Sequence, residues 1–196
     1  MRLPVNLSAM LLALPLGCSS ADEAPPDFPA NDDAQPVMRW DHRPEASYWT
    51  QTSMRAVMAG PLTGVTPDDI ADWCPTYAGN DRESRAMFWV GLLSAVSKHE
   101  STWNPAAVGG GGQWYGLMQI SPGTAKGYGC SASSGGALKD GAANLACAIR
   151  IIGQTVPRDG VVAAGGRGVA ADWGPFHNAA KRADIRSWTA QQSYCR

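Results

Sequence analysis

The chain has 196 residues, of which 44% are hydrophobic and 17% are charged, and its formal net charge is −1. This near-neutral balance offers no basic surface for a phosphate backbone, so the sequence makes no electrostatic case for a nucleic-acid partner. From residue 46 onward the chain is long enough for one domain with its own hydrophobic core and too short for two.

The N-terminus has the pattern of an export signal. Met1-Arg2 precedes a mainly apolar run from Leu3 to Gly17, which is shorter than the roughly 20 residues that a membrane-spanning helix needs. Gly17-Cys18 indicates a bacterial lipoprotein signal over residues 1–18, whose last residue would carry the lipid. Because Pro15 stands where such signals usually carry Leu, Val or Ile, ordinary secretion with cleavage nearby is the alternative. We expect an exported, periplasmic protein that a lipid anchor attaches to the outer membrane.

The distribution of residue types predicts a disordered tether followed by a single domain. Residues 19–45 are rich in Pro, Asp and Ala and contain little to bury. Residues 46–196 predict a mainly α (α+β) domain with a small extended element. Thr66 and Ser121 are expected to cap helices, since each precedes a proline that suits the first helical position. The expected helices cover about 66–74, 82–101, 138–154 and 181–192, with a short one from 122, an extended segment over 117–120 and loops over 109–112 and 160–168.

Four cysteines follow Cys18, and an even number suits an oxidising compartment. They are Cys74, Cys130, Cys147 and Cys195. Of the three possible pairings we favour the one with Cys130–Cys147, which would staple a glycine-rich segment to the helix that follows. Cys74–Cys195 would then tie the start of the domain to its end. Zinc is the competing use of four cysteines, but the sequence contains no C-x-x-C pair.

The helix expected over 82–101 ends in a candidate general acid. Trp89, Leu93, Val96 and Glu100 recur at helical spacing, so one apolar stripe ends in a carboxyl group. Burial at the edge of the core would raise the pKa of Glu100. A carboxylic acid that stays protonated near neutral pH can protonate the leaving oxygen of a glycosidic bond. A solvent-exposed glutamate at a helix end is the alternative.

Two other motifs in this region are incomplete. His99-Glu100 begins like the zinc-protease motif H-E-x-x-H, but Trp103 stands where the second histidine is required. The glycine run over 109–112 lacks the Lys and the Ser or Thr of a phosphate-binding loop. We therefore expect no metal site and no phosphate-binding loop here, and we assign His99 to the helix surface or to packing.

The combination of Glu100-Ser101 with Gly116-Leu117-Met118-Gln119-Ile120 resembles the lytic transglycosylases and goose-type lysozymes, which cut the glycan of bacterial peptidoglycan. The resemblance covers roughly residues 82–190 and is specific over 100–120. It implies a lysozyme-like fold, a catalytic Glu100, peptidoglycan strands as the partner and no cofactor. It does not identify any protein partner.

The resemblance also implies the reaction. In this family one glutamate protonates the β-1,4 bond between N-acetylmuramic acid (MurNAc) and N-acetylglucosamine (GlcNAc). The same glutamate then removes a proton from the 6-hydroxyl of MurNAc, which closes on the anomeric carbon to give 1,6-anhydro-MurNAc. Ordinary glycosidases use two carboxylates, whereas no second acid follows Glu100 before Asp140 in this sequence.

Four further positions match the family's motifs. Ser101 is expected to hydrogen-bond the substrate or to hold the glutamate, and a serine that bonds its own helix backbone is the alternative. Met118 and Gln119 match the pair that lines the cleft, although a core position is the alternative for Met118. Asn144 matches a position on the next helix, where the resemblance implies a structural hydrogen bond.

The sequence departs from the family near its C-terminus, where relatives carry Ala-Tyr-Asn-Ala-Gly. The corresponding segment here is Phe176-His177-Asn178-Ala179-Ala180, so His177 replaces the tyrosine near the catalytic glutamate and Asn178 keeps the asparagine. An imidazole at this position can still hydrogen-bond Glu100, and its charge would depend on pH; a surface histidine is the alternative. Tyr115 is a second candidate for the missing hydroxyl.

Two other functions remain as alternatives. If Asp172 approached Glu100, it could activate a water molecule and make the protein a lysozyme-type hydrolase. Trp173, next to it, is either a sugar platform or a core residue. A protein that kept the fold without activity would be a glycan-binding component of the envelope, against which the intact Glu100 argues.

Overall fold

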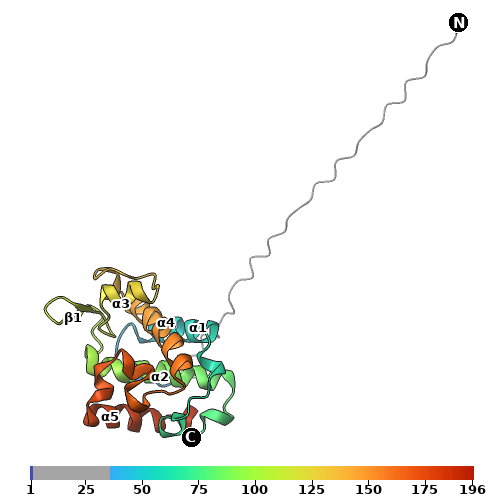
Figure 1. The fold of residues 1–196 in the computed structure, drawn as a ribbon, viewed down its shortest axis with the longest axis vertical. Coiled ribbons are helices and arrows are strands. Elements are labelled where there is room, and N and C mark those ends of the chain that lie inside the picture. Colours follow the sequence, from blue (N-terminus) through green and yellow to red (C-terminus); the bar gives the residue numbers. More distant parts are fainter. Residues whose placement is uncertain (2–35) are drawn as a thin grey trace. The chain divides into compact units, whose positions relative to one another are not determined.

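The computed structural model describes residue 1 and residues 36–196. The expected signal sequence, Cys18 and residues 19–35 of the expected tether lie outside this described part. Residues 36–196 form a mainly helical domain with a short antiparallel hairpin (Figure 1). The α-helices are α1 (Ala46–Ala59), α2 (Arg82–Glu100), α3 (Pro122–Gly127), α4 (Gly141–Asp159) and α5 (Ala179–Ala190), and the hairpin pairs β1 (Val108–Gly109) with β2 (Trp114–Tyr115). Short 3-10 helices connect them: η2 (Leu62–Gly64), η3 (Ile70–Asp72), η4 (Tyr77–Gly79), η5 (Ala137–Lys139), η6 (Ala164–Gly166), η7 (Gly168–Ala171), η8 (Gly174–His177) and η9 (Ser193–Cys195).

Helix α2 forms the axis of the core. The Asp81 carboxylate caps its first turn by accepting a hydrogen bond from the backbone N–H of Ser84 (2.7 Å). Every residue from Phe88 to Ser97 is buried, because α1, α5, η2 and η9 all pack against this helix. The sequence predicted one apolar stripe on this helix, but α2 is buried on all sides, as is typical of a core helix. Its last residue, Glu100, stands where complete burial ends.

Helices α3, α4 and α5 occupy the predicted regions with shifts at their ends. Ser121 caps α3 as expected, because its hydroxyl accepts a hydrogen bond from the N–H of Thr124 (3.0 Å). Helix α4 starts later than predicted, since the Asp140 carboxylate caps its first turn, and it continues to Asp159. Asn178 caps α5 in the same way. None of the helices in residues 36–196 is long and apolar enough to span a membrane.

Two local predictions are wrong. Residues 66–74 form no α-helix beyond the single 3-10 turn η3, because the Asp69 carboxylate instead accepts hydrogen bonds from the backbone N–H groups of residues 162–164. Residues 117–119 lie in a turn rather than an extended segment, since Gly116 and Gln119 adopt positive φ angles of 78° and 46°. The strand that the sequence placed there is β2, directly before this turn.

The packed domain begins before residue 46, so the predicted tether is too long. Met38 and Trp40 are buried, with 2% and 0% of their surface exposed. The Arg39 guanidinium donates two hydrogen bonds to the Asp184 carboxylate of α5, at 2.7 and 2.8 Å. That carboxylate also accepts hydrogen bonds from the side chains of Lys98 and His99 on α2. Residues 36–45 therefore belong to the domain.

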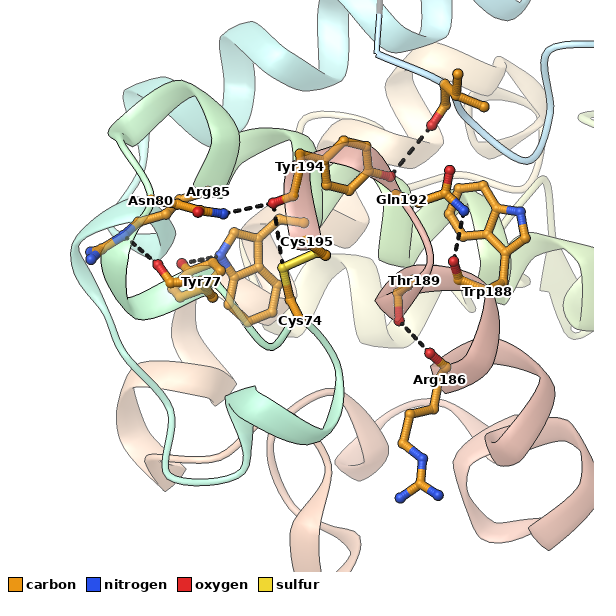
Figure 2. Close-up of a disulfide and its surroundings, with 12 residues drawn as sticks. Cys74, Tyr77, Asn80, Arg85, Arg186, Trp188, Thr189, Gln192, Tyr194 and Cys195 are labelled. Carbon is orange, nitrogen blue, oxygen red and sulfur yellow. Dashed lines mark hydrogen bonds between the residues drawn. A yellow bond between two sulfur atoms is a disulfide. The ribbon is translucent and has the colours of Figure 1, made fainter.

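The two favoured disulfides, Cys74–Cys195 and Cys130–Cys147, are both present. Figure 2 shows that the first joins the C-terminal turn η9 to the segment before α2. The Asn80 amide next to it donates a hydrogen bond to the carbonyl of Tyr194 (2.6 Å). The hydroxyl of Tyr194 reaches the carbonyl of residue 37 (3.4 Å). The first and last described segments of the domain are thus held to each other.

Trp40→Ala tests whether residues 36–45 are part of the core. The indole is fully buried, stacks edge-on against Trp49 and donates a hydrogen bond to the Thr50 hydroxyl (2.9 Å). We expect the free energy of unfolding, measured in urea, to fall by about 3–5 kcal/mol. Val37→Ala is the matched control, because this nearby side chain is 59% exposed and its loss should change stability by less than about 0.5 kcal/mol. Equal effects of the two substitutions would contradict the assignment.

Candidate active site

Glu100 has the environment that a general acid requires. It is the last residue of α2, and burial raises the pKa of its carboxyl group from 4.5 to about 7, while the ammonium group of Lys181 partly opposes the rise. No hydrogen bond holds this carboxyl group among the described residues. A substantial fraction of Glu100 is therefore neutral at pH 7 and free to donate its proton.

The carboxyl group opens into a cleft of about 440 Å³. The cleft lies between the end of α2, the hairpin and the segment that follows η7. Its lining residues are Glu100, Gly109, Gly110, Trp114, Gln119, Asp172, Trp173 and Gly174. A hollow of about 380 Å³ between α1 and α4 is lined by no carboxylate among the described residues, so the Glu100 cleft is the candidate active site.

A buried asparagine fixes the turn that faces Glu100. The Asn144 side chain, completely inaccessible to solvent, donates hydrogen bonds to the carbonyls of Tyr115 and Leu138 (both 2.9 Å). Its carbonyl oxygen accepts a hydrogen bond from the N–H of Met118 (2.8 Å). This is the structural role expected for Asn144. The turn also requires Gly116, because a Cβ atom at that position would lie 2.1 Å from the carbonyl oxygen of Leu138.

Three side chains connect this turn to the rest of the site. The Ser101 hydroxyl donates a hydrogen bond to the carbonyl of Leu117 (2.9 Å), so it ties the end of α2 to the turn. The Trp173 indole donates to the carbonyl of Met118 (2.9 Å), and only 3% of Trp173 is exposed. Gln119 lines the cleft as expected and anchors its amide on the carbonyls of residues 107 and 116. The side chain of Met118 is completely buried. Met118 is therefore a core residue, which was the alternative to its predicted place in the cleft.

Backbone strain is concentrated around the acid. Among the described residues, the non-glycine positions with positive φ are Thr102, Trp103 and Gln119. The first two lie two and three residues after Glu100, and the third lies in the facing turn. Left-handed conformations of this kind cost on the order of 1 kcal/mol or more each and concentrate at functional sites. Their position therefore supports the assignment of this cleft.

The contacts to Glu100 that the sequence suggested for His177 and Tyr115 do not form in the described part of the chain. The imidazole of His177 donates its Nε2 hydrogen to the carbonyl of Ala170 (2.8 Å), and therefore binds the preceding loop. The Asn178 side chain is exposed and caps α5. The Tyr115 hydroxyl donates to the carbonyl of Gly112 (2.6 Å) within the hairpin. The Tyr115 hydroxyl is therefore not available beside Glu100.

Asp172 shares the cleft with Glu100 but is engaged elsewhere. Its carboxylate accepts a hydrogen bond from the Tyr128 hydroxyl (3.0 Å). Burial and this neighbouring carboxylate both raise the pKa of the Tyr128 phenol. The groups that shift the pKa of Glu100 do not include Asp172. The two acids therefore line the same cleft, but Asp172 does not affect the pKa of Glu100.

Three residues of the site were missed in the sequence. Tyr128 and Lys181 act through contacts with residues far away along the chain, for which no local pattern exists. Trp114 lines the cleft with 45% of its surface exposed, whereas five of the eight tryptophans are buried. Its place two residues after the glycine run 109–112 was a usable signal, because that run predicted a loop rather than a core element.

Known proteins resemble this chain in sequence and fold. Residues 79–164 match the family model of the transglycosylase SLT domain. Solved structures of Bd0314 DslA cover 83% of this chain and 99% of their own at 28% identity. Their TM-scores are 0.74 for a wild-type form and 0.74 and 0.75 for two glutamate-to-glutamine mutants. No curated protein sequence matches the chain. The predicted mainly α, lysozyme-like fold is confirmed.

The raised pKa of Glu100 should appear in the pH dependence of stability. Because the unfolded chain ionises this group near 4.5 and the folded chain only near 7, the wild-type protein loses stability as the pH rises between these values, by up to about 3 kcal/mol. Glu100→Gln lacks this loss. The difference in free energy of unfolding between the variant and the wild type should therefore grow in favour of the variant from pH 4 to pH 8. A difference that stays constant over this range would rule out the buried acid.

Proposed function

We propose that this chain, which belongs to the lytic transglycosylase family, cleaves the MurNAc-β-1,4-GlcNAc bond of peptidoglycan and releases 1,6-anhydro-MurNAc. The observation that carries the proposal is a single half-buried carboxylic acid, with a pKa of about 7, that opens into the cleft. Such a group can act first as an acid and then as a base without a large change in free energy.

In the first step, neutral Glu100 donates its proton to the oxygen that links MurNAc to GlcNAc. The bond between that oxygen and the anomeric carbon of MurNAc breaks, and positive charge develops on the carbon. The N-acetyl group of the same sugar steadies this charge. GlcNAc leaves with the proton as a 4-hydroxyl, and Glu100 becomes a carboxylate that the ammonium group of Lys181 helps to stabilise.

In the second step, the Glu100 carboxylate removes the proton from the 6-hydroxyl of MurNAc. The oxygen bonds to the anomeric carbon and closes the 1,6-anhydro ring, which returns the glutamate to its neutral form. No water is consumed, so a second carboxylate for activating water, as in ordinary glycosidases, is not needed. The engagement of Asp172 by the Tyr128 hydroxyl supports this one-acid route over hydrolysis.

Among the motif residues beyond Glu100, we propose Gln119 as a direct substrate contact. It faces the cleft, and its fixed amide can orient an N-acetyl or hydroxyl group. Ser101 positions the turn relative to the acid. The side chains of Met118, His177 and Asn178 are engaged in packing, in a loop contact and in a helix cap, so we assign them supporting roles.

The products of digestion test the reaction. The full chain, purified in detergent, should convert peptidoglycan into muropeptides that mass spectrometry finds lighter by one water than their reducing counterparts. Glu100→Gln should lower the rate by at least about 100-fold, since a positioned general acid contributes at least that much. Glu83→Gln, at the exposed first turn of the same helix, is the matched control and should digest normally. Asp172→Asn should leave the anhydro products unchanged; reducing-end products that vanish in this variant would establish the hydrolase instead.

We also propose that the protein is exported and anchored through a lipid on Cys18. Two disulfides suit an oxidising compartment such as the periplasm, and residues 1–18 have the composition of a lipoprotein signal. Mass spectrometry of protein extracted from cell envelopes should find Cys18 as an acylated N-terminal residue. An unmodified N-terminus at another position would favour ordinary secretion.

A further inference from the structure

The hairpin exposes an aromatic side chain that the core does not require. Trp114 on β2 is 45% exposed and lines the Glu100 cleft. It also lines a neighbouring hollow of about 60 Å³, which shares Gln119, Asp172 and Trp173 with the cleft. The indole therefore stands at the junction of two adjoining hollows, one of which contains the acid.

The glycine run provides the surface against which this indole lies. A Cβ atom on Gly110 would lie 2.3 Å from the Cε3 and Cζ3 atoms of the Trp114 ring, so any larger residue would displace the ring. Gly111 and Gly112 have open space beside them. The ring thus lies against the backbone at Gly110, while 45% of the Trp114 surface remains exposed.

The hairpin itself is braced, which keeps the ring in place. The Tyr115 hydroxyl donates a hydrogen bond to the carbonyl of Gly112 (2.6 Å), and the N–H groups of residues 112 and 113 both donate to the carbonyl of Gly109 (3.0 Å). A planar apolar surface held rigidly in a polar cleft loses little conformational entropy when it binds a ligand. The Asp172 carboxylate lines the same hollow and can accept hydrogen bonds from hydroxyl groups of the same ligand.

We propose that Trp114 is a sugar-binding platform, on which the apolar C–H face of a pyranose ring stacks. Its ligand is a β-1,4-linked N-acetylhexosamine strand, of which one residue lies on the indole while a neighbouring linkage reaches Glu100. This inference rests on the proposed function, because it assigns the position of the same glycan substrate. It makes Trp114 a residue that determines substrate affinity without taking part in proton transfer.

Kinetics with substituted full-length protein test the platform. Trp114→Ala should raise KM for soluble glycan strands about tenfold and leave kcat within about twofold, while Trp114→Phe should restore most of the affinity. Tyr48→Ala is the matched control, because this 61% exposed aromatic residue lies on α1 and lines neither hollow. An unchanged KM in Trp114→Ala, or a loss confined to kcat, would overturn the proposal.

Two glycine variants test whether the contact between Gly110 and the Trp114 ring matters for binding. Gly110 and Gly111 both adopt positive φ, at 56° and 66°, so an alanine at either position bears the same left-handed strain. Only Gly110→Ala adds a methyl group where the indole lies. We expect Gly110→Ala to reproduce the KM increase of Trp114→Ala and Gly111→Ala to match the wild type. Equal KM values in the two glycine variants would overturn the role of Gly110.

Binding without turnover separates this inference from the proposed reaction. In the Glu100→Gln background, calorimetry with tetra-N-acetylchitotetraose should show binding that Trp114→Ala weakens by a similar factor. This result would support the platform even if the wild-type protein released no muropeptides, which would contradict the proposed reaction alone. If Glu100→Gln did not bind the oligosaccharide, or if it and the double variant with Trp114→Ala bound equally well, the platform would be overturned whatever the digestion shows.

Discussion

The site depends on a carboxyl group held at the boundary between a buried helix and an open cleft. Because α2 is buried on all sides from Phe88 to Ser97, the core fixes the direction of the helix and therefore the position at which Glu100 meets the cleft. Partial desolvation raises the pKa of Glu100 to about 7. The same desolvation makes the ionised carboxylate unfavourable in the folded state. The raised pKa that suits a general acid therefore lowers the free energy of unfolding once Glu100 ionises.

The opposite wall of the cleft is equally constrained. Asn144 binds three backbone groups around the turn at 116–119, and Trp173 and Ser101 add hydrogen bonds from two further elements. The strained residues flank this arrangement on both sides. A cleft whose two walls are fixed before the substrate arrives can align a glycosidic bond with the acid at a small cost in entropy. The wild-type form of Bd0314 DslA shares this fold over most of the chain.

Helix spans and caps were predicted well from local sequence signals, whereas most side-chain contacts were not predicted. Spacing predicted the span of α2, and capping chemistry predicted the Ser121 cap. The cysteine count left three pairings open, and the favoured one is present. The start of the domain was missed, because Arg39 is fixed by Asp184, 145 residues away. The family pattern indicated Glu100 and Asn144, but it could not show that His177 binds Ala170 or that Gly110 lies against Trp114. Both contacts join residues fewer than ten positions apart, but they depend on loop conformations that no sequence pattern specified.

The most direct measurement is the pKa of Glu100 itself. The chain contains four glutamates, at positions 23, 45, 83 and 100, so selective ¹³C labelling of glutamate gives a carboxyl spectrum that is simple to follow against pH. The resonance that disappears in Glu100→Gln identifies the acid. A midpoint near 7 is the result expected here. A midpoint near 4.5 would mean that Glu100 is ionised at neutral pH, and the assignment of this residue as the general acid would be wrong.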